Sequence, residues 1–198
     1  MATNGRAHHF KLADRLWHSD SSFRAVPAKY SLLSGRVVPA KGGDTEFADM
    51  RQAYDALDDE TKQEIEGLVC EHSLIFSRGL LGFDTEMSAE ERKGFRPARQ
   101  SLVRVHPVSG RKSLYLSAHA GPILGWPMPE ARAFLRDLTE HAVQRQFVYA
   151  HKWRQGDLVI WDNRQTMHRA RPFKDTTEVR DMRRTTVAGE AMTAEQAA

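Results

Sequence analysis

The sequence contains almost no cysteine and no long apolar run. Cys70 is the single cysteine among 198 residues, which excludes a disulfide framework within the chain and a metal cluster held by thiolates. No apolar run approaches the roughly 18 residues that a membrane-spanning helix needs. The first residues also lack the apolar segment of a secretory signal. We therefore expect a cytoplasmic protein without a membrane partner.

A strong excess of either charge is also missing. The chain carries 29 lysine and arginine residues against 26 aspartate and glutamate residues, a formal net charge of +3. This excess is too small to indicate a nucleic-acid partner, and no basic run is interleaved with aromatic residues. A mild positive bias instead favours a small anionic substrate. The length and the 40% hydrophobic fraction are typical of one globular domain with a sizeable core.

Strand-like patterns dominate both ends of the sequence, and helical patterns fill its middle. Strands are predicted at 30–38, 101–106, 112–117, 147–151 and 157–161, and helices at 47–57, 60–71 and 129–143. The weakly patterned stretch 76–100 is interpreted as a long excursion or lid. Cys70 is interpreted as a buried, inert thiol on a helix face. The order of elements predicts a mainly β fold with a helical insertion, an antiparallel sandwich or jelly roll.

Two separate motifs carry the side chains of a candidate metal site. Alternate side chains of an extended segment share a face, so His18 and Asp20 can reach one cation. His168 follows a strand-like run and a polar turn, 168 − 20 = 148 residues after Asp20. Two histidines and one carboxylate form the facial triad of non-haem iron(II) oxygenases, which leaves three coordination positions open. Taken alone, His-x-Asp also fits surface polar residues that follow a strand.

Arginines near the carboxyl end form a third pattern. Arg180 and Arg184 are four residues apart, so they share a face in a strand and in a helical turn, whereas Arg183 is out of phase. Arginine binds carboxylates through two parallel hydrogen bonds, which suits an anionic substrate or co-substrate. The alternative interpretation is a solvated basic cluster.

Five motifs occur in a fixed order and span nearly the whole chain. They are LWHSDSSF at 16–23, GGDTEF at 42–47, HPVSGRK at 106–112, WDNRQTMH at 161–168 and the arginine-rich end from 180. In these motifs the sequence resembles the TauD/TfdA family of 2-oxoglutarate-dependent dioxygenases. Within that family it is most similar to the branch acting on 2,4-dichlorophenoxyacetate and related aryloxyalkanoates. The resemblance implies a double-stranded β-helix, a cupin-like jelly roll.

The same resemblance implies a metal and two co-substrates. The metal is Fe(II), its ligands are His18, Asp20 and His168, and 2-oxoglutarate and dioxygen are consumed with the substrate. The family's reaction yields succinate and carbon dioxide while it hydroxylates the substrate. On an aryloxyalkanoate, hydroxylation beside the ether oxygen gives a hemiacetal that breaks into a phenol and a 2-oxo acid. The carboxylate of Asp20 favours hydroxylation, because related halogenases carry a small residue there.

Three further residues receive roles from the resemblance. Thr45 and Arg180 match the pair that binds the distal carboxylate of 2-oxoglutarate. Arg184 matches the arginine that binds the anionic group of the primary substrate. Arg183 remains an alternative to Arg180, because the spacing from His168 is one residue longer than in relatives.

The amino-terminal region departs from the family pattern. Seventeen residues precede His18, whereas relatives carry a long segment there that contributes to the substrate pocket. We therefore expect residues 1–190 to form a single, amino-terminally truncated catalytic domain, followed by a flexible tail at 191–198. Two other functions stay open: a dioxygenase for taurine, alkyl sulfonates or sulfate esters, and a truncated, catalytically silent remnant. Because relatives commonly assemble, a homo-oligomer is a further expectation.

Overall fold

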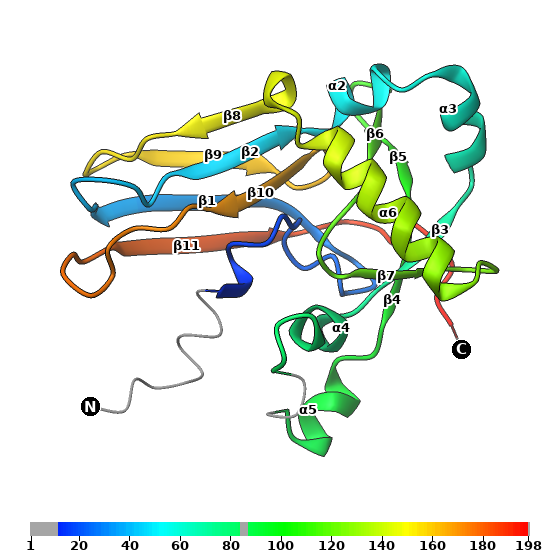
Figure 1. Ribbon diagram of the computed structural model, residues 1–198, viewed down its shortest axis with the longest axis horizontal. Coiled ribbons are helices and arrows are strands. Elements are labelled where there is room, and N and C mark those ends of the chain that lie inside the picture. The colour runs from blue at the N-terminus through cyan, green and yellow to red at the C-terminus, as the bar shows by residue number, and fades with distance from the viewer. Residues whose placement is uncertain (1–11, 84–86, 198) are drawn as a thin grey trace.

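The computed structural model describes residues 12–83 and 87–197, in which strands predominate (Figure 1). The strands are β1 (Ala28–Val37), β2 (Thr45–Asp49), β3 (Val69–His72), β4 (Ala98–Ser101), β5 (Val103–Val105), β6 (Lys112–Leu114), β7 (Ala120–Ile123), β8 (Val148–His151), β9 (Leu158–Asp162), β10 (Thr166–Ala170) and β11 (Asp181–Ala188). The helices are α2 (Met50–Asp55), α3 (Asp59–Ile65), α4 (Leu74–Gly79), α5 (Ala89–Gly94), α6 (Met128–Ala142) and the 3-10 helix η2 (Arg145–Phe147).

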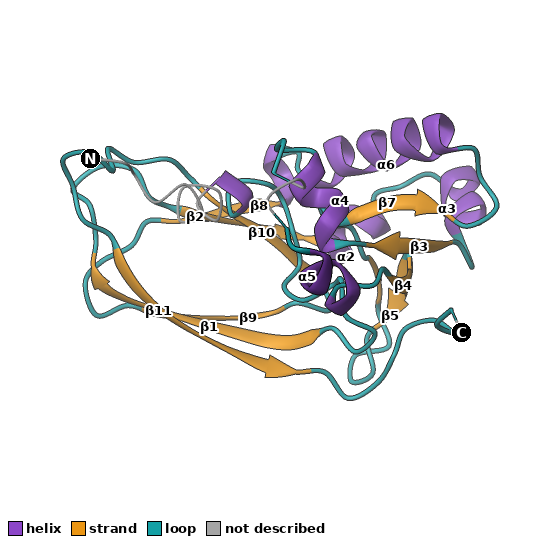
Figure 2. Cartoon of the chain, turned by 90° about the horizontal axis from the view of Figure 1, so that it is seen from below, coloured by secondary structure: helices purple, strands orange, loops and turns teal. Residues whose placement is uncertain are grey.

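Two three-stranded antiparallel sheets face each other as layers at one end of the molecule (Figure 2). One sheet has the order β11-β1-β9 and the other β10-β2-β8. The chain changes sheet between β1 and β2, and again at each step from β8 to β11. Residues from both sheets line one pocket, so the inner faces of the two layers enclose a shared space.

The other end of the molecule combines helices with a third three-stranded sheet and a two-stranded sheet. β3 pairs with β4 and β7, β5 pairs with β6, and α6 packs against β7 and α2. Buried residues recur along α6 at helical spacing, which gives this helix one apolar face. The apolar cluster that these elements share includes Ala53, Leu57, Ile65, Cys70, Leu102, Leu114, Leu116, Ile123, Leu135 and Leu138. Among the described residues, no helix is both long and apolar enough to cross a membrane.

The predicted helix at 47–57 is wrong at its beginning. Phe47 lies in β2, which pairs with β8 along one edge and with β10 along the other. Pairing on both edges satisfies the backbone of this segment as a strand, despite its helical apolar pattern. Helix α2 begins only after Asp49, whose side chain accepts hydrogen bonds from the backbone N–H groups of Arg51 and Gln52.

The predicted helix at 60–71 is wrong at its end. Helix α3 stops at Ile65, and Gly67 adopts a φ of 77°, in the left-handed region that favours glycine. Cys70 therefore lies on β3 and not on a helix face. It is fully buried, as predicted, and burial raises the pKa of its thiol to about 12, which disfavours the reactive thiolate.

Other predicted elements agree with the structure. The hairpin around 107–111 is confirmed by the antiparallel pairing of β5 with β6. The helix predicted at 129–143 is confirmed by α6, with proline in its first turn. The strands predicted at 147–151 and 157–161 correspond to β8 and β9, which belong to different sheets.

Two segments are more regular than their sequences suggest. The stretch 76–100, interpreted as an excursion or lid, contains α5 and parts of α4 and β4. The segment predicted as a tail runs beside β4. There Ser101 N donates to Thr193 Oγ1 at 3.1 Å, and Arg99 N donates to Gln196 Oε1 at 2.9 Å.

Candidate metal centre

The backbone brings the two histidines of the predicted triad side by side. His18 and His168 form an isolated antiparallel bridge in which each backbone N–H donates to the other residue's carbonyl at 2.9 Å. This exchange of two hydrogen bonds links the segment before β1 to strand β10. The imidazole of His168 is further held by the aromatic rings of Trp161 and Phe47, whose centroids lie 4.7 and 6.1 Å away. Residues that are distant in sequence thus become direct neighbours.

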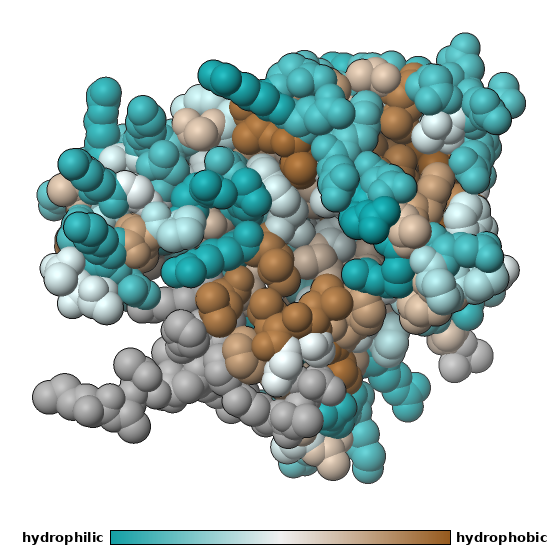
Figure 3. Space-filling model, in the orientation of Figure 1, coloured by the Kyte–Doolittle hydropathy of each residue, from teal (hydrophilic) through white to brown (hydrophobic). Residues whose placement is uncertain are grey.

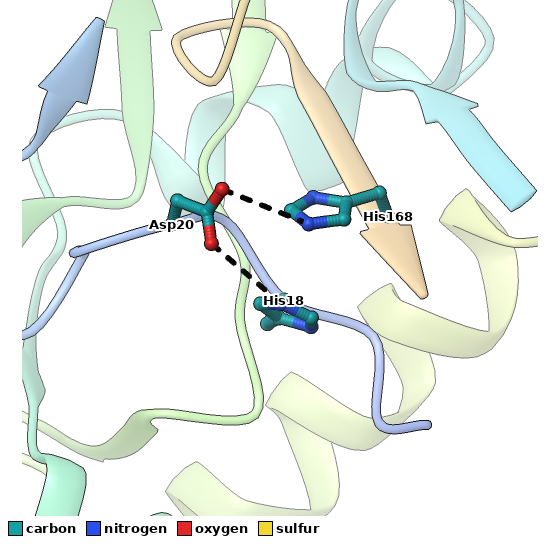
Figure 4. Close-up of side chains that lie close together, drawn as sticks. All are labelled: His18, Asp20 and His168. Atoms are coloured by element: carbon teal, nitrogen blue, oxygen red, sulfur yellow. Dashed lines mark ion pairs between the residues drawn. The ribbon is translucent and has the colours of Figure 1, made fainter. Parts of the chain in front are cut away.

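Three side chains converge between the sheets (Figure 4). His18 and Asp20 come from the segment before β1 and His168 from β10, and one ligand atom from each lies within 4.8 Å of the others. The Nε2 atoms of His18 and His168 are each 3.8 Å from one of the two carboxylate oxygens of Asp20. The three residues are 9%, 7% and 5% exposed, in chain order. The structure therefore brings together all three residues that the sequence analysis selected as metal ligands.

The polar contacts of these three side chains suit a divalent cation. His18 Nδ1 donates to the carbonyl of Leu16 at 2.7 Å, which leaves Nε2 facing Asp20. Burial lowers the pKa of His168 to about 3, which keeps its imidazole neutral. Burial opposes ionisation of Asp20, but His168, His18, Arg184 and a hydrogen bond from Ser31 together hold its pKa below the usual value. Two imidazoles and a carboxylate fit Fe(II) and similar metals.

A pocket of about 210 Å³ lies against the histidines and is lined by both sheets. Thr45 of β2, Arg180 just before β11 and Arg184 within β11 all line it, together with Trp161 and Met182. Arg180 Nε donates to the carbonyl of Gly43 at 3.2 Å, and burial lowers the pKa of the Arg180 guanidinium. A partly buried guanidinium and a hydroxyl in one pocket provide donors for a carboxylate.

Two glycines explain how Arg180 reaches this position. Gly42 has a φ of 75°, and a Cβ there would lie 2.5 Å from the carbonyl of Pro172. Gly43 has a φ of 73°, and its missing side chain leaves room for Cδ of Arg180 at 3.4 Å. The Gly-Gly pair of the second sequence motif therefore lets the loop before β11 approach β2 closely.

Arg183 and Arg184 occupy different environments on β11. Arg183 is exposed, and its Nε lies 3.8 Å from Asp181, away from the pocket. The Arg184 side chain is 53% exposed, and its Nη1 donates to Asp20 Oδ1 at 3.2 Å. The structure thus gathers Arg180 and Arg184 at the site and leaves Arg183 outside it, as strand alternation requires.

A second pocket of about 260 Å³ adjoins the first at His18 and Arg184. Its walls include Phe23, Phe95 and His119, whose rings form edge-to-face pairs. His119 Nδ1 lies 2.8 Å from the Ser77 hydroxyl, and burial places the pKa of His119 well below its usual value. No spacing in the sequence pointed to His119 as part of this site.

Two facing β-layers that hold a cluster of two histidines and one carboxylate place the chain among β-rich proteins with a candidate metal site between their sheets. Comparison with known proteins makes the assignment specific. The family model described as "Taurine catabolism dioxygenase TauD, TfdA family" matches residues 2–186, and the chain belongs to this family.

Curated relatives and solved structures agree with the family. The alpha-ketoglutarate-dependent 2,4-dichlorophenoxyacetate dioxygenase of Cupriavidus pinatubonensis is 51% identical over 180 residues, covering 91% of this chain and 62% of the relative. The alpha-ketoglutarate-dependent sulfate ester dioxygenase of Pseudomonas putida is 33% identical, covering 88% of this chain and 60% of the relative. The chain therefore spans less than two thirds of the length of these relatives. The crystal structure of AAD-2 in complex with Mn(II) and N-oxalylglycine superposes with a TM-score of 0.91 at 64% identity, covering 95% of this chain and 74% of AAD-2.

Proposed function

We propose that the chain is the catalytic part of an Fe(II)- and 2-oxoglutarate-dependent dioxygenase that hydroxylates a small anionic substrate. The observation that carries this proposal is the convergence of His18, Asp20 and His168 within 4.8 Å beside a pocket lined by arginines. In the proposal these three residues hold the metal. When bound, Fe(II) supplies the oxidative chemistry with dioxygen and 2-oxoglutarate, and this set of three ligands leaves it positions for both.

Thr45 and Arg180 are proposed to hold the distal carboxylate of 2-oxoglutarate. Both line the pocket beside the histidines, whereas Arg183 does not. The hydrogen bond from Arg180 Nε to Gly43 leaves the Nη atoms of the guanidinium available to a carboxylate. Trp153 Nε1 donates to Thr45 Oγ1 at 2.9 Å, so the Thr45 hydroxyl can direct its own proton to a second acceptor.

Arg184 is proposed to bind the anionic group of the primary substrate. It lines both pockets, and the second pocket offers the aromatic walls of Phe23 and Phe95. This combination of a guanidinium and apolar rings suits an aryloxyalkanoate, an ether acid that would be cleaved to a phenol and a 2-oxo acid, with succinate and carbon dioxide as co-products. Holding the carboxylate at Arg184 would orient the reacting carbon relative to the metal, and such positioning can lower a barrier by several kcal/mol.

We further propose that the two sheets form the double-stranded β-helix of a cupin-like jelly roll. The alternation of β8, β9, β10 and β11 between the layers supports this arrangement. Residues 1–190 would then make up one catalytic domain. Assembly into a homo-oligomer remains part of the proposal.

An anaerobic titration tests the metal and co-substrate site. Fe(II) and 2-oxoglutarate added to wild-type protein are expected to produce the weak visible charge-transfer band of their chelate. The His168→Ala variant is expected to lose this band while it keeps its folded circular-dichroism spectrum. A folded wild-type protein without the band would favour a catalytically silent remnant.

Succinate formation with a substrate panel then tests the substrate class. Aryloxyacetates and aryloxypropionates are expected to stimulate succinate release more than taurine, alkyl sulfonates or sulfate esters. The greater identity to the dichlorophenoxyacetate dioxygenase, 51% against 33%, supports this order. Preferential release with sulfonates or sulfate esters would instead select the alternative dioxygenase.

A further inference from the structure

We infer that Ser31 and Asn163 are positioning residues that orient the Asp20 carboxylate for metal binding. Neither residue would touch the metal or a substrate, and each would act through Asp20. The inference rests on the proposed function, since it concerns the same metal centre. It adds two residues, one from β1 and one from the turn between β9 and β10, to a site so far defined by its ligands.

Ser31 makes the shortest polar contact to the carboxylate. Its hydroxyl donates to Asp20 Oδ2 at 2.6 Å, a distance typical of a charge-assisted hydrogen bond to an anion. Ser31 is fully buried on β1, where its backbone is paired with β9 and β11. A donor on the central strand of a sheet has little freedom to move, so it restricts rotation of the carboxylate.

Asn163 fixes the direction of the Ser31 hydrogen bond. Its Nδ2 donates to Ser31 Oγ at 2.9 Å and so occupies a lone pair of the Ser31 oxygen. The single hydroxyl proton of Ser31 is therefore directed at Asp20. The Asn163 amide is itself oriented by two donors that face its Oδ1. These are Asp20 N at 3.1 Å and Trp161 Nε1 at 3.0 Å. A flipped amide would place its NH2 group against both donors, so this arrangement has one satisfied orientation.

The result is a closed network in which Asn163 holds both the backbone and, through Ser31, the side chain of Asp20. Asn163 is 0% exposed, so water does not compete for these hydrogen bonds. Ser31 thus engages Oδ2, the carboxylate oxygen that lies 3.8 Å from His168 Nε2, while Oδ1 lies 3.8 Å from His18 Nε2. The other contact to Oδ1 comes from Arg184, whose half-exposed side chain can move aside without breaking the network.

Groups that hydrogen-bond to a metal ligand and orient it generally increase the affinity of the site for the metal. Loss of a group that orients a ligand typically weakens metal binding about 10- to 100-fold. Ser31→Ala is therefore expected to lower the affinity for Mn(II), measured by electron paramagnetic resonance of the free ion, by about this factor. With Oδ2 released, the Co(II)-loaded variant is also expected to show a changed visible absorption spectrum.

Ser22→Ala is the matched control. Ser22 is also fully buried, lies two residues from Asp20 in the sequence, and its hydroxyl has no hydrogen-bond partner among the described residues. Removing it deletes the same atoms at the same depth but touches no group of the network. Wild-type Mn(II) affinity and an unchanged Co(II) spectrum are expected. Equal losses in Ser22→Ala and Ser31→Ala would overturn the inference, because the effect would then come from the cavity.

A double-variant cycle tests whether Asn163 acts through Ser31. Asn163→Ala is expected to weaken Mn(II) binding, and the Ser31→Ala/Asn163→Ala protein is expected to lose less affinity than the product of the two single effects. Independent, multiplicative losses would contradict the network, as would wild-type affinity in Ser31→Ala. Wild-type protein that binds no Mn(II) would overturn the proposed metal centre, and this inference with it.

Discussion

The two ends of the molecule bury different kinds of side chain. The end built from α2, α3, α6 and β3–β7 holds most of the apolar cluster, with residues such as Ile65, Leu102 and Leu135 at 4% exposure or less. Between the two facing sheets the buried residues are largely polar, among them Asp20, Ser31 and His168. Apolar packing therefore stabilises one end, while the other end keeps a polar interior that can bind ligands.

The surface and the sheet edges reflect the same division. Figure 3 shows mostly hydrophilic side chains over the sheet end on the left and apolar ones gathered near the middle of this face. On β9, an edge strand, Leu158 and Ile160 are more than half exposed, while Trp161, which follows Ile160, is buried and lines the pocket. Substitutions at the two ends should therefore separate metal binding from stability.

The largest effect is expected from Asp20→Asn. This change keeps the shape of the side chain but removes the charge that two histidines and Arg184 surround. Mn(II) binding is expected to become undetectable by paramagnetic resonance, while the midpoint of urea unfolding stays near that of wild type, since Asp20 lies outside the apolar cluster. A large loss of stability would show that the two ends are not separable.

Leu135→Ala should give the opposite result. Leu135 is 4% exposed on α6, and truncating a buried leucine typically costs about 2–5 kcal/mol of unfolding free energy. Urea unfolding measures this loss directly. Mn(II) affinity of the folded fraction is expected to stay at the wild-type level, and a fall in that affinity would contradict a division between the two ends.

Arg180→Gln tests the pocket within the sheet end, with Arg183→Gln as its control. A hydrogen-bonded charge contributes about 1.5–3 kcal/mol, so the Arg180 variant should bind 2-oxoglutarate about 10- to 100-fold more weakly in the anaerobic titration. Arg183 is exposed on the same strand and outside the pocket, so its variant should bind normally. The reverse result would assign the co-substrate carboxylate to Arg183.

His72, at the end of the molecule built from α2, α3, α6 and β3–β7, is expected to make the stability of the protein depend on pH. It is fully buried, neither ring nitrogen has a hydrogen-bond partner among the described residues, and burial lowers its pKa from about 6.5 to about 3. The folded state then binds fewer protons than the unfolded state between these values, so stability is lost as the pH falls below about 6.5.

The size of that effect can be isolated with His72→Leu. Between pH 7 and pH 5 the wild type is expected to lose about 2 kcal/mol more unfolding free energy than the variant. Urea unfolding at both pH values measures the difference. Parallel losses in the two proteins would show that His72 is not the titrating group.

The sequence was more informative about the site than about the packing around it. The residue types and strand alternation made His18, Asp20, His168, Arg180 and Arg184 candidates, and the five motifs shared with the family gave them their roles. Ser31 carries no such signal, since only the register of β1 brings it to Asp20. Asn163 stood within a recognised motif, but its role depends on two donors that converge only in the folded chain.

Errors in the predicted elements have a similar cause. Phe47 follows a helical pattern, but pairing of β2 on both edges is a tertiary property that local periodicity cannot report. The helical pattern predicted over 60–71 continues past Gly67, but this glycine lies two residues beyond the end of α3 and its positive φ turns the chain into β3. Local patterns thus predicted burial correctly in places where they predicted the wrong element.

The smallest effect is expected from Trp153→Phe, which tests how finely the pocket is arranged. The substitution keeps a ring but removes the donor to Thr45 Oγ1, after which the Thr45 proton is no longer directed toward the pocket. A neutral hydrogen bond contributes about 0.5–1.5 kcal/mol, so losing it should weaken 2-oxoglutarate binding by a few-fold. Trp126→Phe is the control, since Trp126 packs against the apolar cluster at the other end. Equal affinities in the two variants would show that Thr45 does not depend on Trp153 for its orientation.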